Sequence, residues 1–512
     1  MGTSRTNNTI RNSKSGLVLK LINILGAFFA RTVLIRTLGV EYVGLDGLFT
    51  SVLTFLNMTE LGFSTAIVYK FYQPIAENNV DRVCALMNFY KKVYRYIGAI
   101  VLALGLLVLP FLRFFIKGSP PDNIEVHVLY LIYLANACGS YWLFAYETAV
   151  LNAQQRNDIV SKVTSAVLIV KYILQIILMF TFRNYYLYAI ILPLSTLLTN
   201  IGMHYVTRKY YPQFVCKGNI EKSDIKEIKQ KVSALLINKI GTAIITGSDN
   251  IVISSFLGLT ILGIYDSYYY IFNMLYGIFA VFHSAITASI GNSIVLETKK
   301  TNEKLFYKLS FINYWAVGWS SICLLCLYSP FISIWVGKEK VIGDLFSLLM
   351  AVYFFFWMSR FIITIYKSAQ GLWWEDRYRA LIEGGVNLLL NLLAVKLIGI
   401  YGITLSTIIA MLIVSIPWET RVLFKKYFEE SPIHYFKTIS IGTIMLSVIG
   451  AITYLISKIV PVEGIFRVII VGVICIIVPN TIMICVFRNT NEYRWMKYFI
   501  RSRITRMIRR EK

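Results

Sequence analysis

Apolar segments of about twenty residues follow one another along almost the whole chain, from residue 15 to residue 487. A helix of that length crosses roughly 30 Å of hydrocarbon at about 1.5 Å per residue. The composition agrees, because 57% of the 512 residues are hydrophobic and only 15% are charged. An average soluble domain is about 25% charged. The sequence therefore predicts an all-α, polytopic membrane protein.

We predict about fourteen transmembrane helices, at residues 15–38, 43–70, 94–116, 125–150, 159–182, 185–207, 232–257, 261–290, 309–336, 344–370, 378–398, 401–424, 438–458 and 465–487. An even number places both termini on one side. Lys and Arg gather at the helix ends of that side and are sparse in the opposite turns, so both termini are expected in the cytoplasm. The same asymmetry accounts for the net charge of +24 without a nucleic-acid partner.

Short loops limit the functions that the chain can carry. The outer loops have no more than about a dozen residues, and no loop on either side could form a folded domain. Cys323 and Cys326 form a CxxC motif without a second pair or a nearby His, which favours packing over metal or redox chemistry. We therefore expect no catalytic residue, no metal site and no enzyme activity.

The first two predicted helices carry charges that are costly in lipid. Along the first, Lys20 and Arg31 share one face with Asn23 and Ala27. Along the second, the polar residues recur with helical period: Asp46, Thr50, Thr54, Asn57 and Ser64, with Glu60 beside them. A charge near the bilayer centre costs roughly 2.5–3.5 kcal/mol on insertion scales. The two stripes therefore predict one wall of a hydrophilic cavity.

An internal repeat relates the two halves of the chain. ARTVLIRTLGVEYVGLDGLF from residue 30 aligns with SDNIVISSFLGLTILGIYDSYY from residue 248, which places Gly39 on Gly258 and Gly44 on Gly263. VLNAQQRNDI from residue 150 aligns with SAQGLWWEDR from residue 368 at almost the same offset. Two matches at one offset indicate a duplication into parallel six-helix lobes.

The repeat predicts the domain organisation and a second cavity wall. The expected parts are an N-lobe (1–207), a cytoplasmic loop (208–231), a C-lobe (232–424), two further helices (425–487) and a basic cytoplasmic tail (488–512). The second lobe supplies the remaining candidate residues, namely the cations Lys239 and Arg360 and the polar residues Asp249, Asp266 and Asn273. Carboxylates in this set could bind H⁺ or Na⁺ and couple an ion to transport. No other cofactor is expected.

LIRTLGVEYVGLDGLF and NMTELGFSTAI, together with the fourteen helices in two lobes, resemble the polysaccharide-transport (Wzx-like) flippases. This family belongs to the superfamily of multidrug, oligosaccharidyl-lipid and polysaccharide exporters, which includes the multidrug exporters and the lipid II flippase. The resemblance implies translocation of an undecaprenyl-diphosphate-linked oligosaccharide across a bacterial cytoplasmic membrane. It also implies a cationic central cavity, to which Arg31 is the first candidate contributor, and an extra hydrophobic groove at the two last helices.

Three functions are compatible with these observations. The lipid-linked oligosaccharide flippase comes first, with the bilayer and the lipid-linked glycan as partners and with a polysaccharide polymerase and a chain-length regulator as expected protein partners. An ion-coupled multidrug exporter would favour a more anionic cavity, so Lys20, Arg31, Lys239 and Arg360 count against it. A membrane polymerase or glycosyltransferase would need catalytic outer loops, which the short turns do not provide.

Overall fold

The computed structural model describes residues 2–60 and 63–499, and within these ranges every regular element is a helix. Twelve of the described helices are long and apolar enough to cross a membrane, and one bent pair supplies a thirteenth candidate. The predicted all-α polytopic fold is therefore confirmed. The predicted span at 43–70 is the one not counted, because its α-helix ends at Leu56 and it includes residues 61–62, which lie outside the described ranges.

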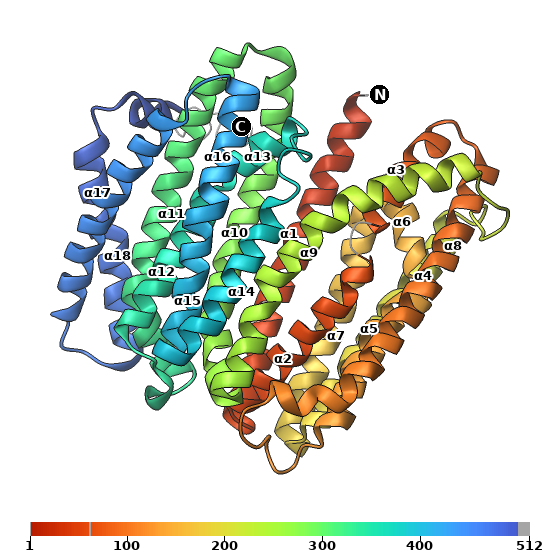
Figure 1. Ribbon diagram of the computed structural model, residues 1–512, viewed down its shortest axis with the longest axis horizontal. Coiled ribbons are helices and arrows are strands. Elements are labelled where there is room, and N and C mark those ends of the chain that lie inside the picture. Colours follow the sequence, from red (N-terminus) through yellow and green to blue (C-terminus); the bar gives the residue numbers. More distant parts are fainter. Residues whose placement is uncertain (1, 61–62, 500–512) are drawn as a thin grey trace, which may run out of the picture. The chain divides into compact units, whose positions relative to one another are not determined.

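The chain divides into two compact units (Figure 1). Unit 1 comprises Met1–Asp266 and Ala380–Ile400. Its helices are α1 (Gly2–Thr37), α2 (Val40–Leu56), the 3-10 helix η1 (Asn57–Glu60), α3 (Phe63–Ala76), α4 (Val80–Val108), η2 (Leu109–Phe115), α5 (Val126–Trp142), α6 (Ala145–Ala153), α7 (Asn157–Phe182), α8 (Tyr185–Tyr210), α9 (Lys222–Leu257), the first turns of α10 (Leu259–Leu296) and α14 (Arg379–Ile398).

Unit 2 comprises Ser267–Arg379 and Tyr401–Lys512. It contains the rest of α10, α11 (Lys299–Trp335), η3 (Lys338–Lys340), α12 (Asp344–Ser359), α13 (Phe361–Ala369), α15 (Ile400–Ala410), the π-helix η4 (Met411–Ser415), α16 (Ile416–Leu423), the π-helix η5 (Phe424–Phe428), α17 (Ile433–Lys458) and α18 (Gly464–Phe487). Residues 491–499 form a further short helix. The lobe boundaries at 207 and 232 stay a prediction.

Three predicted spans are broken helices. The span at 43–70 ends its α-helix at Leu56 and continues as a 3-10 turn over Asn57–Glu60. The span at 125–150 bends by 50° between α5 and α6, where Phe144 has a left-handed φ of 56°. The span at 344–370 breaks at Arg360, between α12 and α13.

Glycines at the two matched turns adopt the same backbone conformation. Gly39 and Gly258 join consecutive helices with φ of 115° and 95°, a conformation that favours glycine. One turn later, a Cβ on Gly44 would lie 2.2 Å from the Leu259 carbonyl oxygen, and one on Gly263 would lie 2.0 Å from that of Val40. The aligned positions therefore share backbone geometry, and they form the crossing of α2 with the start of α10 because no side chain intervenes.

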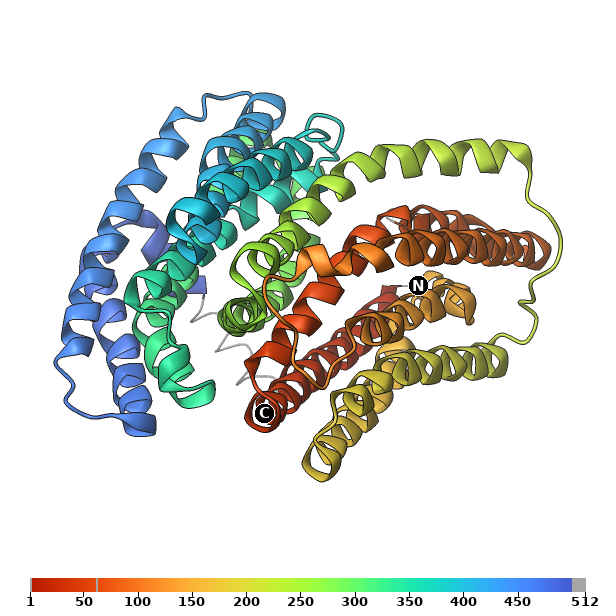
Figure 2. The same cartoon turned by 60° about the horizontal axis from the view of Figure 1, so that its bottom comes forward.

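The connection between α8 and α9 is shorter than the predicted loop. The chain leaves α8 at Tyr210 and enters α9 at Lys222, so the intervening segment runs along the end of unit 1 (Figure 2). Asp224 pairs with Lys70 at 3.0 Å and with Arg82 at 3.3 Å. Lys70 also contacts Glu227. These pairs fix the first turns of α9 to α3 and α4.

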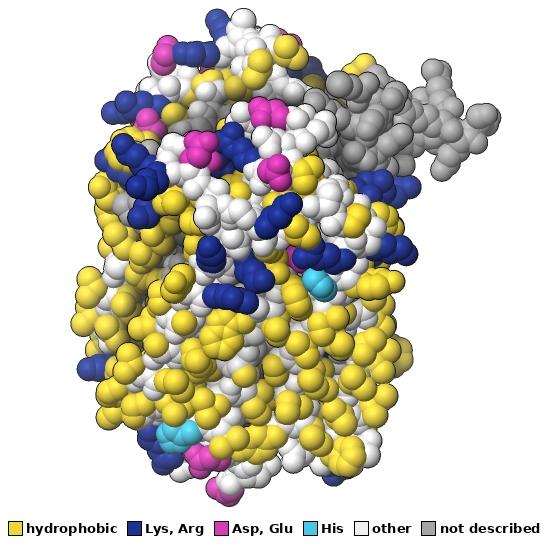
Figure 3. Space-filling model, turned by 90° about the vertical axis from the view of Figure 1, so that its right-hand side faces the viewer, with side chains coloured by type: hydrophobic (Ala, Val, Ile, Leu, Met, Phe, Trp, Pro, Cys, Tyr) yellow, Lys and Arg dark blue, Asp and Glu magenta, His cyan; other side chains and the backbone are white. Residues whose placement is uncertain are grey.

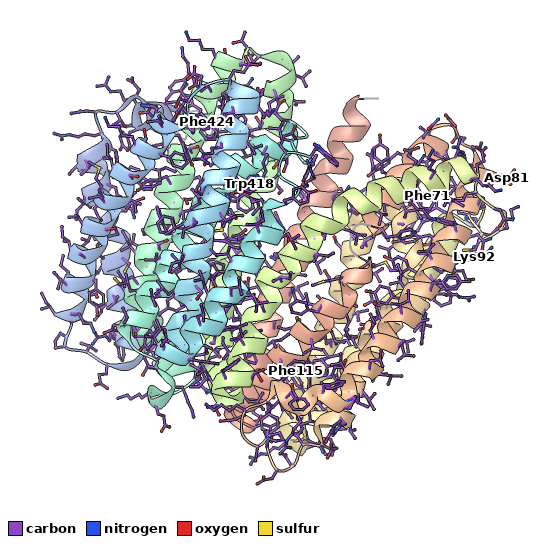
Figure 4. All side chains as sticks on the ribbon, viewed as in Figure 1. Phe71, Asp81, Lys92, Phe115, Trp418 and Phe424 are labelled. Carbon is purple, nitrogen blue, oxygen red and sulfur yellow. The ribbon has the colours of Figure 1, made fainter. Side chains whose placement is uncertain are left out.

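Surface side chains follow the pattern expected for a membrane. The face in Figure 3 shows a broad band of hydrophobic side chains with Lys and Arg gathered toward one end. In Figure 4, Asp81 and Lys92 lie at the end of unit 1 opposite to Phe115. A charged end and an apolar band are typical of a multi-pass protein with a positive-inside bias.

Candidate functional site

Unit 1 contains a cluster of two basic and two acidic side chains, which come from four different helices. Arg31 comes from α1, Asp46 from α2, Lys171 from α7 and Asp266 from α10. Asp266 is buried with 9% of its surface exposed, and the charges of Arg31 and Asp46 both act on it. The charge of Asp46 acts in turn on Lys171. Sequence analysis singled out Arg31, Asp46 and Asp266 separately, and the fold brings them together.

A chain of tyrosines orients the Asp46 carboxylate. The Tyr133 hydroxyl donates to Asp46 Oδ1 at 2.6 Å and lies 3.0 Å from the Tyr185 hydroxyl. Tyr185 donates to the Tyr42 carbonyl oxygen at 3.1 Å, and Tyr42 donates to Asn123 Oδ1 at 2.5 Å. Because Tyr133 and Tyr185 are 2% and 1% exposed, these bonds form in a water-poor interior, where an unpaired hydroxyl is costly. The network therefore fixes one member of the charge cluster.

Gly47 allows α10 to approach α2 beside this cluster. A Cβ at Gly47 would lie 1.9 Å from Asp266 Oδ2, so any larger side chain would displace that carboxylate. The Asn250 amide donates to the Gly47 carbonyl oxygen at 3.4 Å. The sequence contained this signal, since Gly47 belongs to the repeated VGLDGLF text. The sequence did not show that the Asp266 carboxylate would lie beside Gly47.

Asp249 belongs to a second polar group, also within unit 1. Its Oδ1 accepts from Asn391 Nδ2 at 2.6 Å, and its Oδ2 accepts from the Tyr265 hydroxyl at 3.5 Å. Asn391 Nδ2 also reaches Asn387 Oδ1 at 3.2 Å, and Ser248 Oγ lies 3.4 Å from the same oxygen. Asn391 is fully buried, and among the described residues its Oδ1 has no hydrogen-bond partner.

This second group has the chemistry of a small cation site. A carboxylate, two amide oxygens and two hydroxyls are hard oxygen donors, and the orphan Oδ1 of Asn391 is an acceptor without a proton to accept. Leaving such an acceptor buried costs about 1–3 kcal/mol. Residues Asn387 and Asn391 lie one turn apart on α14, far from Asp249 in sequence, and sequence analysis did not identify them.

Asn57 and Glu60 lie on the 3-10 turn that interrupts the second span. The Tyr141 hydroxyl donates to Asn57 Oδ1 at 2.9 Å, and the Tyr94 hydroxyl donates to Glu60 Oε1 at 2.5 Å. Tyr90 donates to the Tyr94 hydroxyl at 2.9 Å. Tyrosines of α4 and α5 therefore supply partners for the polar side chains of the broken helix.

The remaining candidate residues lie elsewhere. Lys20 is half-buried on α1, eleven residues before Arg31, which corresponds to about 16 Å along a helix. Lys239 is exposed on α9, about 15 Å before Asp249 by the same measure. Asn273 is exposed on the part of α10 that belongs to unit 2. Their roles in a cavity stay predictions.

Arg360 occupies a buried ionic network in unit 2. Its Nε lies 3.0 Å from Glu419 Oε2. Lys367 Nζ lies 3.0 Å from Glu419 Oε1 and 2.5 Å from Asp376 Oδ2. Arg379 Nε lies 3.2 Å from each of the two carboxylates. Three cations and two carboxylates therefore connect the broken α12–α13 segment to α16, on which Trp418 is labelled in Figure 4.

Unit 2 also has an apolar groove beside its last helices. A cavity of about 530 Å³ lies between α11, α12 and α17. Most of the side chains that line it are apolar, such as Ile322, Leu325, Val352 and Leu446. The cavity includes Gly318, whose lack of a side chain allows Leu446 of α17 to pack against α11. Of the two helices predicted at residues 425–487, α17 lines this groove, and α18 contributes no residue to its lining.

Comparisons with known proteins agree with this architecture. Residues 10–290, more than half of the chain, match the family described as "Polysaccharide biosynthesis protein". The fold is similar to that of the lipid II flippase MurJ in an inward closed conformation, with a TM-score of 0.63, 18% identity, and coverage of 94% of this chain and 99% of that chain.

Two further solved structures share the fold. An inward-facing multidrug resistance MATE family transporter of the MOP superfamily has a TM-score of 0.60, with 13% identity and coverage of 80% of this chain and 95% of that chain. A MOP superfamily transporter from Pyrococcus furiosus has a TM-score of 0.54, with 12% identity and coverage of 82% of this chain and 97% of that chain. No curated protein matches the sequence. The chain therefore belongs to the polysaccharide biosynthesis protein family and has the fold of the MOP superfamily transporters.

Proposed function

We propose that the protein is a flippase that moves an undecaprenyl-diphosphate-linked oligosaccharide from the inner to the outer leaflet of a bacterial cytoplasmic membrane. The observation that carries this proposal is the charge cluster of Arg31, Asp46, Lys171 and Asp266 inside a member of a polysaccharide biosynthesis family. Isolated charges at this depth are expensive, so a cluster of them points to a polar cargo.

Arg31 and Lys171 would receive the diphosphate. Arginine binds phosphate oxygens through two parallel hydrogen bonds, whereas lysine acts as a compact positive charge. Asp266 would serve as the counter-charge when no cargo is bound, and the diphosphate would take its place. Because Tyr133 already engages Asp46, that carboxylate stays oriented during the exchange.

The head group and the tail of such a cargo have opposite solvent requirements. The sugars and diphosphate cannot cross hydrocarbon, and the prenyl chain has no reason to leave it. Alternating access of two lobes would then move the head group while the tail stays in lipid.

The polar group around Asp249 would provide ion coupling. Na⁺ would be coordinated by Asn391 Oδ1, which accepts no hydrogen bond from the described residues, whereas H⁺ would neutralise the Asp249 carboxylate. An Asp249→Asn variant is expected to lose ion-dependent transport while it keeps the hydrogen bond to Asn391. Export by the wild type and by Asp249→Asn is measured in vesicles over a range of Na⁺ concentrations and pH values. A dependence on Na⁺ concentration that the variant loses identifies Na⁺, and a dependence on pH that the variant loses identifies H⁺.

The Arg31→Ala variant tests the proposed function directly. Loss of a charge-assisted phosphate contact of about 1.5–3 kcal/mol should reduce export about 10-fold to 100-fold. Lipid-linked repeat units should accumulate in the inner leaflet, and Arg31→Lys should restore part of the export. Arg36→Ala, an exposed arginine one turn farther along α1, is the matched control and should export normally. Normal glycan export in Arg31→Ala would contradict the proposal.

A multidrug exporter is the second candidate, because a MATE transporter shares the fold. Deletion of the gene separates the two functions. A flippase deletion abolishes surface glycan, whereas an exporter deletion raises drug sensitivity and leaves the glycan unchanged.

A further inference from the structure

A groove runs between α1 and α7 on the surface of unit 1, and we call it the α1–α7 groove. It has an apolar part of about 400 Å³ and a polar part of about 430 Å³. Val18, Ile22 and Ile169 line both parts, so the two parts are continuous. The residue numbers of the lining rise together along the two helices, which therefore run in parallel.

The polar part of the groove lies near the starts of both helices. Lys14 and Ser15 line it from α1, and Lys162 and Ser165 line it from α7. Both lysines are exposed, whereas Ser165 is buried. Two ammonium groups and two hydroxyl groups are all hydrogen-bond donors that the oxygen atoms of a phosphate can accept from.

Ion pairs at the first turns of α7 leave an excess of positive charge at this end. The Asp158 N–H donates to Asn12 Oδ1 at 2.9 Å, which ties the start of α7 to the start of α1. The Asp158 carboxylate is shared by three cations: Arg156 at 3.1 Å, Arg11 at 3.2 Å and Lys162 at 3.9 Å. One carboxylate cannot neutralise three cations, so this end of the groove favours an anionic ligand.

Gly26 shapes the apolar part of the groove. A Cβ on Gly26 would lie 2.1 Å from Tyr172 Cδ2, so the glycine allows the Tyr172 ring to lie against α1. The Tyr172 hydroxyl donates to Asn23 Oδ1 at 2.6 Å, which fixes the ring. Aliphatic and aromatic side chains complete the lining, and two of them, Leu25 and Phe29, are more than half exposed. Exposed apolar side chains along a transmembrane helix contact hydrocarbon, so a lipid chain is the occupant that suits this part.

The length of the apolar part distinguishes between lipid chains. Val18 and Phe29, its first and last residues on α1, are eleven residues apart, which is about 16 Å along a helix. One leaflet contributes about 15 Å of hydrocarbon, half of the bilayer core. The acyl chain of a phospholipid spans one leaflet, whereas an undecaprenyl chain is much longer. The groove therefore matches a phospholipid.

The predicted topology assigns the groove to one leaflet. By the positive-inside rule the starts of α1 and α7 would lie on the cytoplasmic side. Lys14 and Lys162 would then lie at the level of the inner-leaflet head groups, where anionic lipids attract basic residues.

We propose that the α1–α7 groove binds an anionic phospholipid of the inner leaflet, with Lys14 and Lys162 on its phosphate and one acyl chain against Tyr172. A ligand that contacts both helices only in the folded protein stabilises their packing. The same two helices carry Arg31 and Lys171 of the charge cluster, so the lipid would support the scaffold of that cluster. The inference does not depend on which cargo the protein transports.

Native mass spectrometry of the purified protein tests the basic end of the groove. The wild type should retain phosphatidylglycerol in preference to phosphatidylcholine with the same acyl chains. The Lys14→Ala/Lys162→Ala double variant should bind phosphatidylglycerol about 30-fold more weakly, at about 5-fold for each basic residue near the membrane surface. Lys92→Ala/Lys209→Ala removes the same charge from exposed positions of unit 1 outside the groove and is the matched control.

A second variant tests whether the lipid lies in the groove. Ile169 lines both parts and is 44% exposed, so Ile169→Trp should fill the groove without a change of charge. Its retention of phosphatidylglycerol should fall to that of phosphatidylcholine. Ile201→Trp, at an equally exposed position of α8, is the control and should bind as the wild type does.

Three results would overturn the inference. They are equal retention of the two phospholipids by the wild type, unchanged binding in Lys14→Ala/Lys162→Ala or in Ile169→Trp, and tighter retention of undecaprenyl phosphate than of phosphatidylglycerol. Glycan export in Arg31→Ala cells tests the proposed function separately, because Arg31 does not line the groove.

Discussion

Unit 1 and unit 2 each contain a fully buried glutamate near the predicted inner ends of their helices, but they neutralise it differently. In unit 1, Glu147 lies 3.0 Å from His204 Nδ1 and 3.4 Å from Arg208 Nη2. The side chains of these partners are 34% and 32% exposed. In unit 2, Glu419 has three cationic partners, and none of their side chains is more than 11% exposed.

The internal repeat makes the contrast sharper. Asp158 of unit 1 and Asp376 of unit 2 occupy the same position of the repeated segment. Both are almost fully buried, and both are paired with Arg or Lys. The Asp158 partners reach solvent, with exposed fractions of 26% for Arg156, 40% for Arg11 and 68% for Lys162, whereas Lys367 and Arg379 are no more than 10% exposed.

This difference teaches that a duplicated position can keep its charge while its energetic role changes. A buried charge whose partners reach water can be rehydrated when one partner is lost. A buried charge whose partners are also buried cannot, so the loss of one member leaves an uncompensated ion. We therefore expect the unit 2 network to be the more sensitive of the two.

The largest effect is expected for Glu419→Ala. Three buried cations would lose a carboxylate that they share, at a cost of about 3–5 kcal/mol. Thermal unfolding of the purified protein, followed by size-exclusion chromatography, should show a greatly lowered midpoint. Glu429→Ala removes an exposed partner of Lys299 and serves as the control. Equal midpoints for both variants would remove the distinction between the two networks.

A smaller effect is expected for Asp376→Asn, at about 1.5–3 kcal/mol for the loss of charged hydrogen bonds. The equivalent Asp158→Asn should cost about 1 kcal/mol or less, because Arg11 and Lys162 can turn to water. The same unfolding measurement compares the pair. A greater loss in Asp158→Asn would reverse the ranking of the two units.

Glu147→Gln should destabilise unit 1 by about 1 kcal/mol, since the amide oxygen can still accept from His204 and Arg208 can reach solvent. Glu147→Leu, which removes every acceptor, should cost more. If Glu147→Gln unfolds the protein as readily as Glu419→Ala, the exposure of the partners does not govern the effect.

The smallest effect belongs to Lys162→Ala. This lysine lies 3.9 Å from Asp158 and is 68% exposed, so its removal should change stability by less than about 0.5 kcal/mol. The difference in unfolding midpoint between Lys162→Ala and the wild type should be the same at low and at high salt, within error. A marked salt dependence would show that Asp158 relies on this lysine.

Much of the fold could be predicted because it depends on local sequence. Helices at membrane depth must satisfy their own backbone groups, so an apolar segment of sufficient length determines a span. The glycine turns at Gly39 and Gly258 were also visible as a repeat, because a positive φ restricts the choice of residue. The helix breaks at Glu60 and Phe144 could not be predicted, since apolar composition alone does not show where a helix is interrupted.

The candidate site could be predicted only in part. Arg31, Asp46 and Asp266 were identified because charges are rare in apolar segments. Asn387 and Asn391 were not identified, since an amide inside a helix has no distinctive sequence signal until its partner is known. Cys475 of α18 lies near Cys323 and Cys326, a neighbour that the CxxC motif did not reveal.

The sequence by itself determined that this chain is a multi-pass helical protein, it indicated an internal duplication, and it located the charges that the membrane makes costly. Hydropathy suffices to predict the membrane spans because lipid acts on each helix separately. Only the tertiary structure decided which charges meet. Arg31 and Asp266, Asp249 and Asn391, and Lys367 and Glu419 lie far apart in the sequence. Their pairing depends on how the helices pack, and that packing decides whether each charge is a structural ion pair or is available to a cargo.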